Sequence, residues 1–165
     1  MEGFIHSNPG FQSCFARFIE FPDYSAIELC RIFGQICRKN GLTLAPALKE
    51  KVIHHFHYLS ERHGKDFANA RLVRNCFEAV INAQASRLAA RSEIGPAALS
   101  LLEADDLLSP AQSEWEAHRK GGKGYIVKCD HCQEVYTWAA DLEITNGECV
   151  RCHKTYNCEF GTPVE

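Results

Sequence analysis

Apolar residues recur at helical spacing through the first two thirds of the chain and predict a small bundle of amphipathic helices. The first stripe consists of Leu29, Ile32, Phe33 and Ile36. The second consists of Leu48, Val52, Ile53, Phe56 and Leu59, and the third of Val73, Phe77, Val80, Ile81 and Leu88. Three or four such helices joined by short loops are typical of a helical bundle.

Capping and turn residues predict where these helices begin and end. Ser25-Ala26-Ile27-Glu28 forms a capping box ahead of the first stripe, and Asn40-Gly41 suits a helix end because both residues tolerate left-handed backbone. Pro46 suits a first helical turn, Gly64 a helix end and Asn69 an N-cap. We therefore expect helices over residues 25–40, 46–64, 69–91 and 97–103.

An apolar run over residues 15–21 precedes the bundle and predicts a buried strand, which Pro22-Asp23 would end. One strand cannot form a sheet, and we find no other strand pattern before residue 125. We therefore expect the partners of this strand to belong to a piece of protein absent from this sequence.

Four cysteines near the C-terminus have the spacing of a zinc ribbon. The pairs Cys129/Cys132 and Cys149/Cys152 each enclose two residues, and sixteen residues separate the pairs. Two such turns can place four thiolates tetrahedrally around one Zn²⁺, in a closed site that is structural and not catalytic. A module of about 40 residues needs such a link, because its apolar core is small.

Other interpretations of these cysteines stay open at this point. They could be an unmetallated remnant or a pair of disulfides, and His131 or His153 could replace a thiolate ligand. Cys158 is left over. Between the pairs, Tyr136 and Trp138 either contact a partner protein or fill the small core of the ribbon.

We expect the ribbon to occupy residues 125–165, with short strands around its two cysteine pairs. Ahead of it, Ser109-Pro110 predicts a helix that ends near Arg119, and Trp115 could anchor this helix on the bundle. Residues 120–124 are rich in glycine and predict a flexible hinge. The segment 109–124 is thus expected to be a helix and a linker.

Composition narrows the functional classes. The chain has 18 basic and 21 acidic residues, so its charge implies no general attraction to nucleic acid or membranes. From residue 119 onward six basic and seven acidic side chains form no basic stripe, which disfavours a nucleic-acid partner. The sequence has no run of about 18 apolar residues and no signal peptide, so we expect a cytoplasmic protein. Nine cysteines then favour free thiols and metal ligation over disulfides.

Two arginines fall near the expected start of the helix over residues 69–91. Arg74 could pair with Glu78 four residues later, whereas Arg71 has no acid at the neighbouring helical positions. A helix N-terminus is already electropositive, so an unpaired arginine there suits an anion such as phosphate. The alternative is a solvated arginine at a surface helix end. Arg71 and, second to it, Arg74 are therefore candidate anion-binding residues.

Three motifs in order resemble the C-terminal part of an AAA+ ATPase of the CbbX-type Rubisco activase and stage V sporulation protein K branch. They are Ser7-Asn8-Pro9-Gly10-Phe11-Gln12-Ser13-Cys14-Phe15, then Ile19-Glu20-Phe21-Pro22-Asp23-Tyr24-Ser25, then Asn69-Ala70-Arg71 with Val73-Arg74-Asn75. The resemblance covers roughly residues 1–108. It implies that residues 1–24 are the truncated edge of the α/β ATPase core and that residues 25–108 are the helical lid. It also implies that Arg71 is the sensor-2 residue, which touches the phosphates of ATP.

The fold class expected is therefore mostly α: a helical AAA+ lid, preceded by a remnant strand of the core and followed by a small β zinc ribbon. The resemblance further implies ATP and Mg²⁺ in a complete AAA+ core, contacts with that core or with neighbouring subunits of a homo-hexamer, and a protein substrate that is remodelled.

Two departures from the family limit this inference. The sequence contains no G-x-x-x-x-G-K-[ST] phosphate loop, so we expect a truncated gene, a fragment or an internal start, inactive alone in ATP hydrolysis. Cys14 stands where the family has an arginine finger, and Arg17 is close in sequence but does not occupy that position. We interpret Cys14 as a small buried thiol. The alternative function is a non-enzymatic zinc-ribbon module that binds a protein or nucleic acid.

The remaining candidate groups are expected to be structural. His54, His55 and His57 lack the spacing of a helical zinc site and are expected at the surface or half-buried. Cys30, Cys37 and Cys76 fall within expected helices and are interpreted as core residues.

Overall fold

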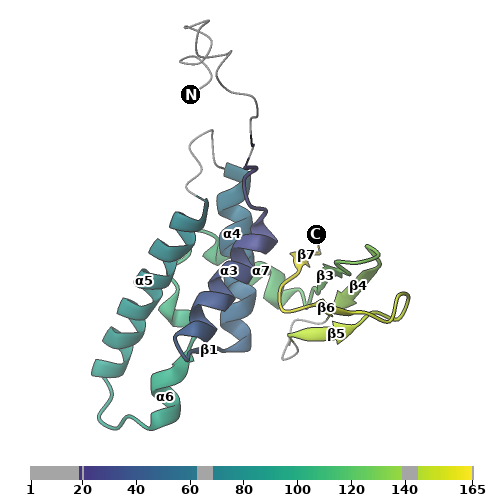
Figure 1. Cartoon of the computed structure of the whole chain (residues 1–165). Coiled ribbons are helices and arrows are strands. Elements are labelled where there is room, and N and C mark those ends of the chain that lie inside the picture. The colour runs from purple at the N-terminus through teal and green to yellow at the C-terminus, as the bar shows by residue number, and fades with distance from the viewer. Residues whose placement is uncertain (1–18, 20, 63–68, 139–144, 165) are drawn as a thin grey trace, which may run out of the picture.

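Three long helices form the main body of the protein in the computed structural model, which describes residues 19, 21–62, 69–138 and 145–164. They are α3 (Ala26–Lys39), α4 (Pro46–Arg62) and α5 (Asn69–Ala89), and they lie side by side in Figure 1. A small β ribbon lies to one side of them. The prediction of a helical bundle followed by short strands is confirmed.

The first helix begins where its capping box predicts. The Ser25 hydroxyl accepts a hydrogen bond from the Glu28 amide at 3.3 Å, and the Glu28 carboxylate accepts one from the Ser25 amide at 2.8 Å. Asn40 caps the other end, and Gly41 follows in the left-handed region with φ of 71°. Local sequence alone therefore sets both limits of α3.

The three predicted stripes meet in one core. Phe33 of α3 packs against Phe56 of α4 and Phe77 of α5, with ring centroids 6.1 and 6.4 Å apart. Stripe residues with no exposed surface are Leu29, Phe33, Leu48, Val52, Phe56, Val73 and Val80. As interpreted from sequence, the thiols Cys30, Cys37 and Cys76 are buried in the same core.

Two histidines of α4 are buried, contrary to expectation. His54 is 8% exposed and His55 is 7% exposed, while His57 is half-buried as expected. The reason for His54 lies outside the three long helices, in α7 (Gln112–Lys120) and the ribbon. The His54 ring packs against those of His118 and Tyr125, with centroids 4.8 and 6.1 Å apart. Nothing in the sequence of α4 itself indicates this cover.

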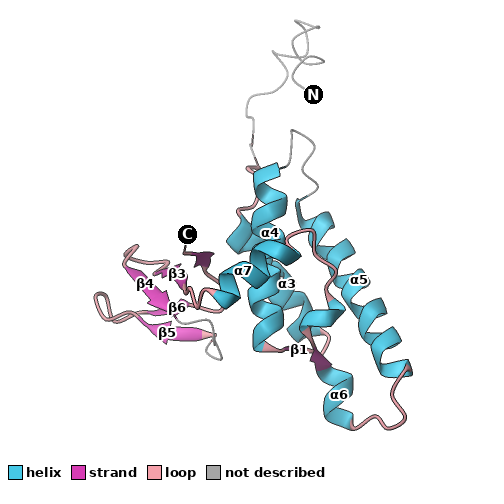
Figure 2. Ribbon diagram, turned by 180° about the vertical axis from the view of Figure 1, so that it is seen from behind, coloured by secondary structure: helices cyan, strands magenta, loops and turns pink. Residues whose placement is uncertain are grey.

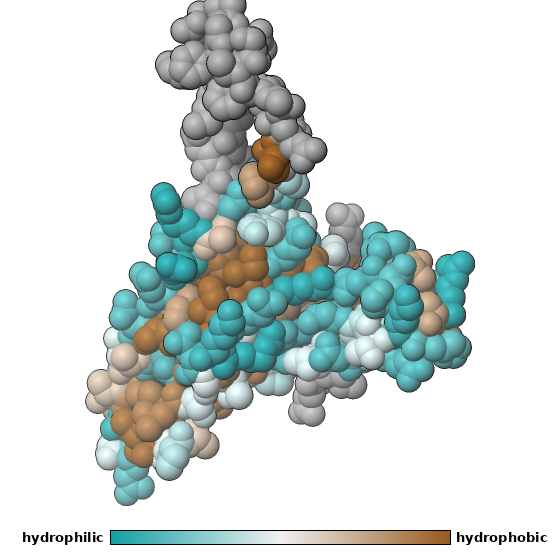
Figure 3. All heavy atoms as spheres, in the orientation of Figure 1, coloured by the Kyte–Doolittle hydropathy of each residue, from teal (hydrophilic) through white to brown (hydrophobic). Residues whose placement is uncertain are grey.

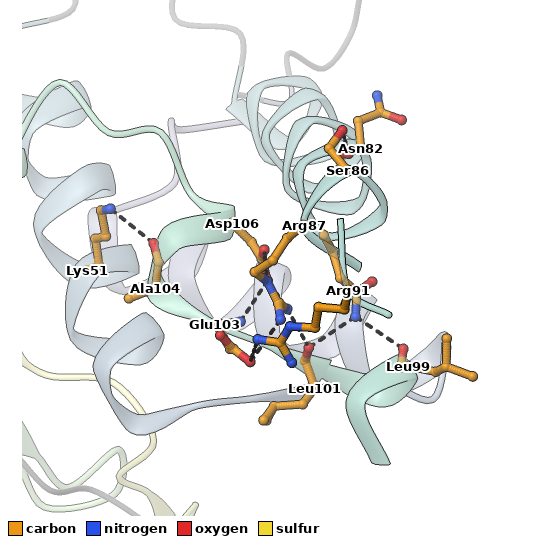
Figure 4. A network of polar contacts seen from close by, with 11 residues as sticks. Lys51, Asn82, Ser86, Arg87, Arg91, Leu99, Leu101, Glu103, Ala104 and Asp106 are labelled. Carbon is orange, nitrogen blue, oxygen red and sulfur yellow. Dashed lines mark hydrogen bonds and ion pairs between the residues drawn. The ribbon is translucent and has the colours of Figure 1, made fainter. Parts of the chain in front are cut away.

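A polar network joins the C-terminal part of α5 to the segment after α6 (Figure 4). After α6 (Pro96–Ser100), strand β2 (Leu101–Leu102) pairs in parallel with β1 (Thr43–Leu44) and leads to a 3-10 turn, η1 (Ala104–Asp106). The sequence patterns predict neither short strand. Arg87 of α5 donates to both carboxylate oxygens of Asp106, at 2.7 and 2.8 Å, and to Glu103 at 2.8 Å.

Helix α7 (Gln112–Lys120) lies across α4, as Figure 2 shows from behind. Trp115 anchors it, as predicted, because its ring is 7% exposed and lies under the Lys51 ammonium, 5.1 Å from the centroid. The helix begins three residues after the expected cap at Ser109, whose hydroxyl instead lies 3.1 Å from His55 Nδ1.

The ribbon consists of two small antiparallel units. Strand β3 (Tyr125–Lys128) pairs with β4 (Val135–Trp138) on one side and with β7 (Thr162–Pro163) on the other. Strand β5 (Asn146–Glu148) pairs with β6 (Thr155–Asn157). Such short strands give the ribbon little stability of its own, so other links must hold it.

The ribbon packs directly against the bundle, and Tyr125 and Phe160 belong to the core of the helices. A flexible hinge at residues 120–124, as expected from the sequence, would not by itself hold the ribbon against the bundle. Gly124 is needed there for close approach, because a Cβ atom would lie 2.3 Å from the Trp138 carbonyl oxygen.

The strand expected over residues 15–21, Cys14 and Arg17 fall mainly outside the described residues. Ile19 and Phe21, which are described, are 70% and 88% exposed. In the view of Figure 3 apolar residues gather over the helices, whereas the ribbon presents mostly hydrophilic residues. Among the described residues, no helix is both long and apolar enough to pass through a membrane.

Candidate functional site

The four cysteines of the two C-x₂-C pairs come together in the ribbon. The sulfur atoms of Cys129, Cys132, Cys149 and Cys152 all lie within 4.8 Å of one another. Cys132 and Cys149 are 3.5 Å apart, and Cys129 and Cys152 are 3.7 Å apart. Tetrahedral coordination with Zn–S bonds of about 2.3 Å requires sulfur atoms about 3.8 Å apart. The donor set therefore fits a metal ion that prefers four thiolates.

Each pair lies in a turn of the same form, which we call the first knuckle (residues 129–134) and the second knuckle (residues 149–154). In the first, Gln133 has φ of 61° and its amide donates to the Cys129 carbonyl at 3.0 Å. In the second, His153 has φ of 55° and donates to Cys149 at 2.8 Å. The matched turns aim all four thiols at one point between the two hairpins.

A tyrosine, Tyr136, contacts one of these four thiols. The Tyr136 hydroxyl lies 3.1 Å from Cys149 Sγ and accepts a hydrogen bond from the Val150 amide at 3.0 Å. Burial raises the pKa of the Cys149 thiol, but hydrogen bonds from Tyr136 and from the Cys152 and Arg151 amides outweigh burial and lower this pKa to about 6. Cys149 thus favours the thiolate form that binds metal. The ring stacks on Tyr156, 5.4 Å away, and so also fills the ribbon core.

The alternative ligands are not part of this cluster. His131 Nε2 lies 3.1 Å from the Thr155 carbonyl oxygen, and His153 Nδ1 lies 3.5 Å from a Glu148 carboxylate oxygen. Cys158 is buried beside the cluster but does not belong to the group of four. No disulfide joins any of the described cysteines, so the disulfide interpretation does not hold for this structure.

The two candidate arginines lie at the start of α5 and are exposed. Neither Arg71 nor Arg74 forms an ion pair with any residue that the structure describes, so the expected pairing of Arg74 with Glu78 does not occur. Both guanidinium groups lie outside the core and within reach of solvent. The first turn of α5 therefore combines two exposed cations with the positive end of a helix.

The start of α5 is tied to the segment that leads into α3. The Asn69 side chain accepts a hydrogen bond from the Tyr24 amide at 2.9 Å and donates one to the Asp23 carboxylate at 2.5 Å. Asn69 itself has φ of 43°, a conformation that asparagine tolerates better than most residues. Arg71 follows two residues later, so this contact fixes the position of its helix turn.

Sequence reasoning misses the residues that join the ribbon to α3. Arg31, Gly34 and Arg38 lie on one face of α3 and receive a segment that we call the C-terminal strap (residues 157–160). The Arg38 guanidinium lies 2.6 and 2.7 Å from the carboxylate oxygens of Glu159, which is 2% exposed. A glycine inside an amphipathic helix is the only signal that could have pointed to this contact.

The family described as AAA lid domain matches residues 25–117, more than half of the chain. The chain belongs to this AAA lid family. Its matched region comprises the bundle and most of α7, whereas the four clustered cysteines lie beyond it.

Individual proteins agree with this assignment. The chain is 39% identical to Protein CbbX of Cereibacter sphaeroides over 124 residues, which cover 74% of the chain and 38% of that protein. It is 33% identical to a Protein CfxQ homolog of Pyropia yezoensis over 112 residues, covering 66% of the chain and 36% of that protein. Stage V sporulation protein K of Bacillus subtilis is 32% identical over 108 residues, covering 65% and 34%.

These relatives identify the bundle as the lid region of a CbbX-type AAA+ ATPase. The chain spans less than two fifths of the length of each of the three. The predicted resemblance is thus confirmed for the lid.

Proposed function

We propose that this lid contributes nucleotide sensing to a CbbX-type AAA+ ATPase, with Arg71 as the sensor-2 residue and Arg74 as a second candidate. The observation that carries the proposal is the exposed guanidinium of Arg71 at the N-terminus of α5, which forms no ion pair with the described residues, within a chain of the AAA lid family. Cations at such a position can contact the phosphates of ATP held with Mg²⁺ by a complete AAA+ core.

The proposed role needs partners. The lid would contact the AAA+ core and neighbouring subunits of a homo-hexamer in the cytoplasm, and its rotation would transmit ATP hydrolysis to the remodelling of a protein substrate. The sequence contains no phosphate loop, so we propose that this chain turns over no ATP by itself.

We further propose that Cys129, Cys132, Cys149 and Cys152 bind one structural Zn²⁺. All four positions around the metal would be taken by protein thiolates, which leaves no place for a substrate. The ion would link the two knuckles and supply the stability that strands of two to four residues cannot.

A second candidate function is a non-enzymatic module in which the zinc ribbon binds a partner. Val135, directly after the first knuckle, and Val150, within the second, are 53% and 78% exposed, which favours an apolar protein surface. Residues 125–165 carry three basic and seven acidic side chains, and this excess of negative charge argues against nucleic acid.

A chimera that joins the AAA+ core of the Cereibacter sphaeroides relative to this lid tests the sensor role. Arg71→Ala is expected to reduce ATP turnover by about tenfold or more, because a phosphate contact is lost. Arg62→Ala, which removes another exposed arginine at the end of α4, is the matched control. Turnover of Arg71→Ala within twofold of the unmodified chimera would exclude Arg71 as the sensor.

Metal analysis tests the second proposal. Purified chain is expected to contain about one zinc ion, and Cys129→Ser with Cys149→Ser is expected to contain none. Stoichiometric zinc in the double variant would rule out this ligand set.

A further inference from the structure

Three residues on one face of α3 receive the ribbon. Arg31, Gly34 and Arg38 are spaced three and four residues apart, so they lie in line along the helix. The Phe160 ring lies over Gly34, where a Cβ atom would be 3.1 Å from the ring. Glu159 pairs with Arg38 at 2.6 Å. The strap therefore runs along two turns of α3 in a single register.

The remaining contact begins inside a knuckle. Asp130 lies between Cys129 and Cys132, and its carboxylate accepts a hydrogen bond from Arg31 Nη2 at 3.1 Å. The same nitrogen donates to the Asn157 carbonyl at 3.3 Å, and the other Asp130 oxygen accepts from the Asn157 amide at 3.4 Å. Arg31 thus joins α3 to the first knuckle and to the start of the strap at once.

The strap is in turn continuous with the second knuckle. Strand β6 (Thr155–Asn157) directly follows that knuckle and ends at the first residue of the strap. Within the strap, the Glu159 amide donates to the Asn157 side chain at 3.1 Å. A metal ion that joins the two knuckles would therefore fix Asp130 and the strap relative to each other, which is the arrangement that Arg31 requires.

We propose that metal in the ribbon is coupled through Asp130, Arg31 and the strap to the order of helix α3, so that metal loss loosens the lid. This inference rests on the proposed zinc site. It gives the ribbon a role as a metal-dependent brace of the lid, in addition to any partner that it binds.

The physical reason is the weakness of the ribbon without the ion. Without the ion, its two hairpins would be joined by the chain, by a small core and by a few exposed polar contacts such as that of Arg151 with Glu134. Once the knuckles separate, Asp130 and Asn157 no longer present their oxygens to Arg31 together, and the strap loses one end. The partly buried charged hydrogen bonds of α3 would then be replaced by water.

Hydrogen–deuterium exchange of the full chain, loaded with zinc or stripped by a chelator, tests the coupling. Amides of α3 are expected to exchange about 5- to 100-fold faster without zinc, which matches the loss of one or a few charged hydrogen bonds. Residues 82–89 of α5 provide an internal reference, because they lie on the helix that carries none of the strap contacts.

Two arginine variants distinguish coupling through Arg31 from a general loosening of the protein on zinc removal. Arg31→Met is expected to bind zinc in the same stoichiometry, while its α3 exchange becomes nearly independent of zinc. Arg151→Met is the matched control, since it removes an ion pair with Glu134 inside the ribbon and leaves α3 untouched. If Arg31→Met fails to fold, the comparison of loaded and stripped wild-type chain still decides the question.

The outcomes are distinguishable. One zinc per chain with unchanged α3 exchange on stripping would overturn the coupling and leave the metal site standing. A chain that takes up no zinc would overturn the metal site and, with it, this inference. Faster exchange of the ribbon and α3 together, reduced in its zinc dependence by Arg31→Met alone, is the supporting result.

Discussion

Glu159 of the ribbon is buried against Arg38 of α3, and both of its carboxylate oxygens lie within 2.7 Å of one guanidinium nitrogen. The Glu159 side chain is 2% exposed, whereas that of Arg38 is 47% exposed. The negative charge of Glu159 is therefore removed from water, and the partly exposed Arg38 guanidinium compensates it. It is a polar link between the bundle and the ribbon.

Removing Arg38 should cost more than removing an ordinary surface arginine. Arg38→Met leaves the buried carboxylate without its cation and is expected to lower the free energy of unfolding by about 2–3 kcal/mol, less than for a fully buried pair because Arg38 is partly screened. Urea unfolding measures this. Arg151→Met, which breaks an exposed pair with Glu134, should cost under about 1 kcal/mol. Equal effects of the two variants would contradict the argument.

The effect of Gly34→Ala on stability should depend on whether Phe160 is present. Glycine-to-alanine changes inside helices usually stabilise by about 1 kcal/mol. Here Gly34→Ala should destabilise instead, because its methyl group would lie 3.1 Å from the buried Phe160 ring and 3.3 Å from Glu159. In a Phe160→Ala background the same change should stabilise by up to about 1 kcal/mol. Thermal unfolding of the wild type, the two single variants and the double variant measures these effects. If Gly34→Ala changes stability in the same direction in both backgrounds, the contact with Phe160 is disproved.

Stability should fall in mild acid because two histidines of α4 are buried. Burial lowers the pKa of both His54 and His55 to about 4, with like charge on His118 and on Lys51, respectively, contributing less. Since their ordinary pKa is 6.5, the unfolded chain binds protons that the folded chain excludes. The stability from neutral histidines is complete above about pH 6.5 and declines down to about pH 4, by at most about 1.4 kcal/mol per pH unit for each histidine.

A variant isolates this effect from acid release of metal. His55→Gln keeps the cysteines and can still hydrogen-bond Ser109, yet it cannot be protonated. The difference in unfolding free energy between pH 7.5 and pH 5 should be about 1–2 kcal/mol smaller than in the wild type. An identical pH dependence would show that His55 is solvated in the folded state.

Removing Arg87 from the polar network at the end of α5 should cause a large loss of stability. Arg87→Met strands the Asp106 carboxylate, whose side chain is 1% exposed, and should cost about 3–5 kcal/mol in chemical unfolding. Arg91 pairs with the same Glu103 at 3.4 Å but is 44% exposed. Arg91→Met is therefore the matched control and should cost under about 1 kcal/mol. Similar losses would mean that burial of Asp106 plays no part.

Tyr136 should tune the proposed metal site without providing a ligand. Tyr136→Phe keeps the ring stacked on Tyr156 but removes the hydroxyl 3.1 Å from Cys149. We expect zinc affinity to fall by about 10- to 100-fold in a competition assay with a chelating dye. Tyr156→Phe, which alters the other ring of the stack, should leave affinity within about threefold. A larger loss in Tyr156→Phe would indicate a packing effect instead.

Local rules predicted a good part of the fold. The capping box at Ser25, the glycine turn at Gly41 and the three apolar stripes all lie where the chain pattern placed them. The helix from Asn69 ends at Ala89, two residues before the expected limit. Each of these features depends on residues within a few positions of one another, so that periodicity and turn chemistry are sufficient.

The four-cysteine cluster was also predictable, because the spacing of two C-x₂-C turns restricts where the thiols can point. The burial of His54 and His55 was not, since His54 packs against rings of α7 and β3 and His55 lies against Ser109, all far from α4 in sequence. The pairing of β1 with β2 joins residues 43–44 to 101–102 and leaves no periodic pattern in either segment.

The sequence by itself determined the helices, their buried stripes, the metal-binding pattern and the AAA lid family, because each depends on the spacing of residues along the chain. Only the tertiary structure decided that the ribbon packs on α3 and shares its core. That contact joins Arg31 to Asp130, Gly34 to Phe160 and Arg38 to Glu159, across about 100 residues or more of sequence. Contacts at such separation follow from shape and charge in three dimensions, which no local pattern records.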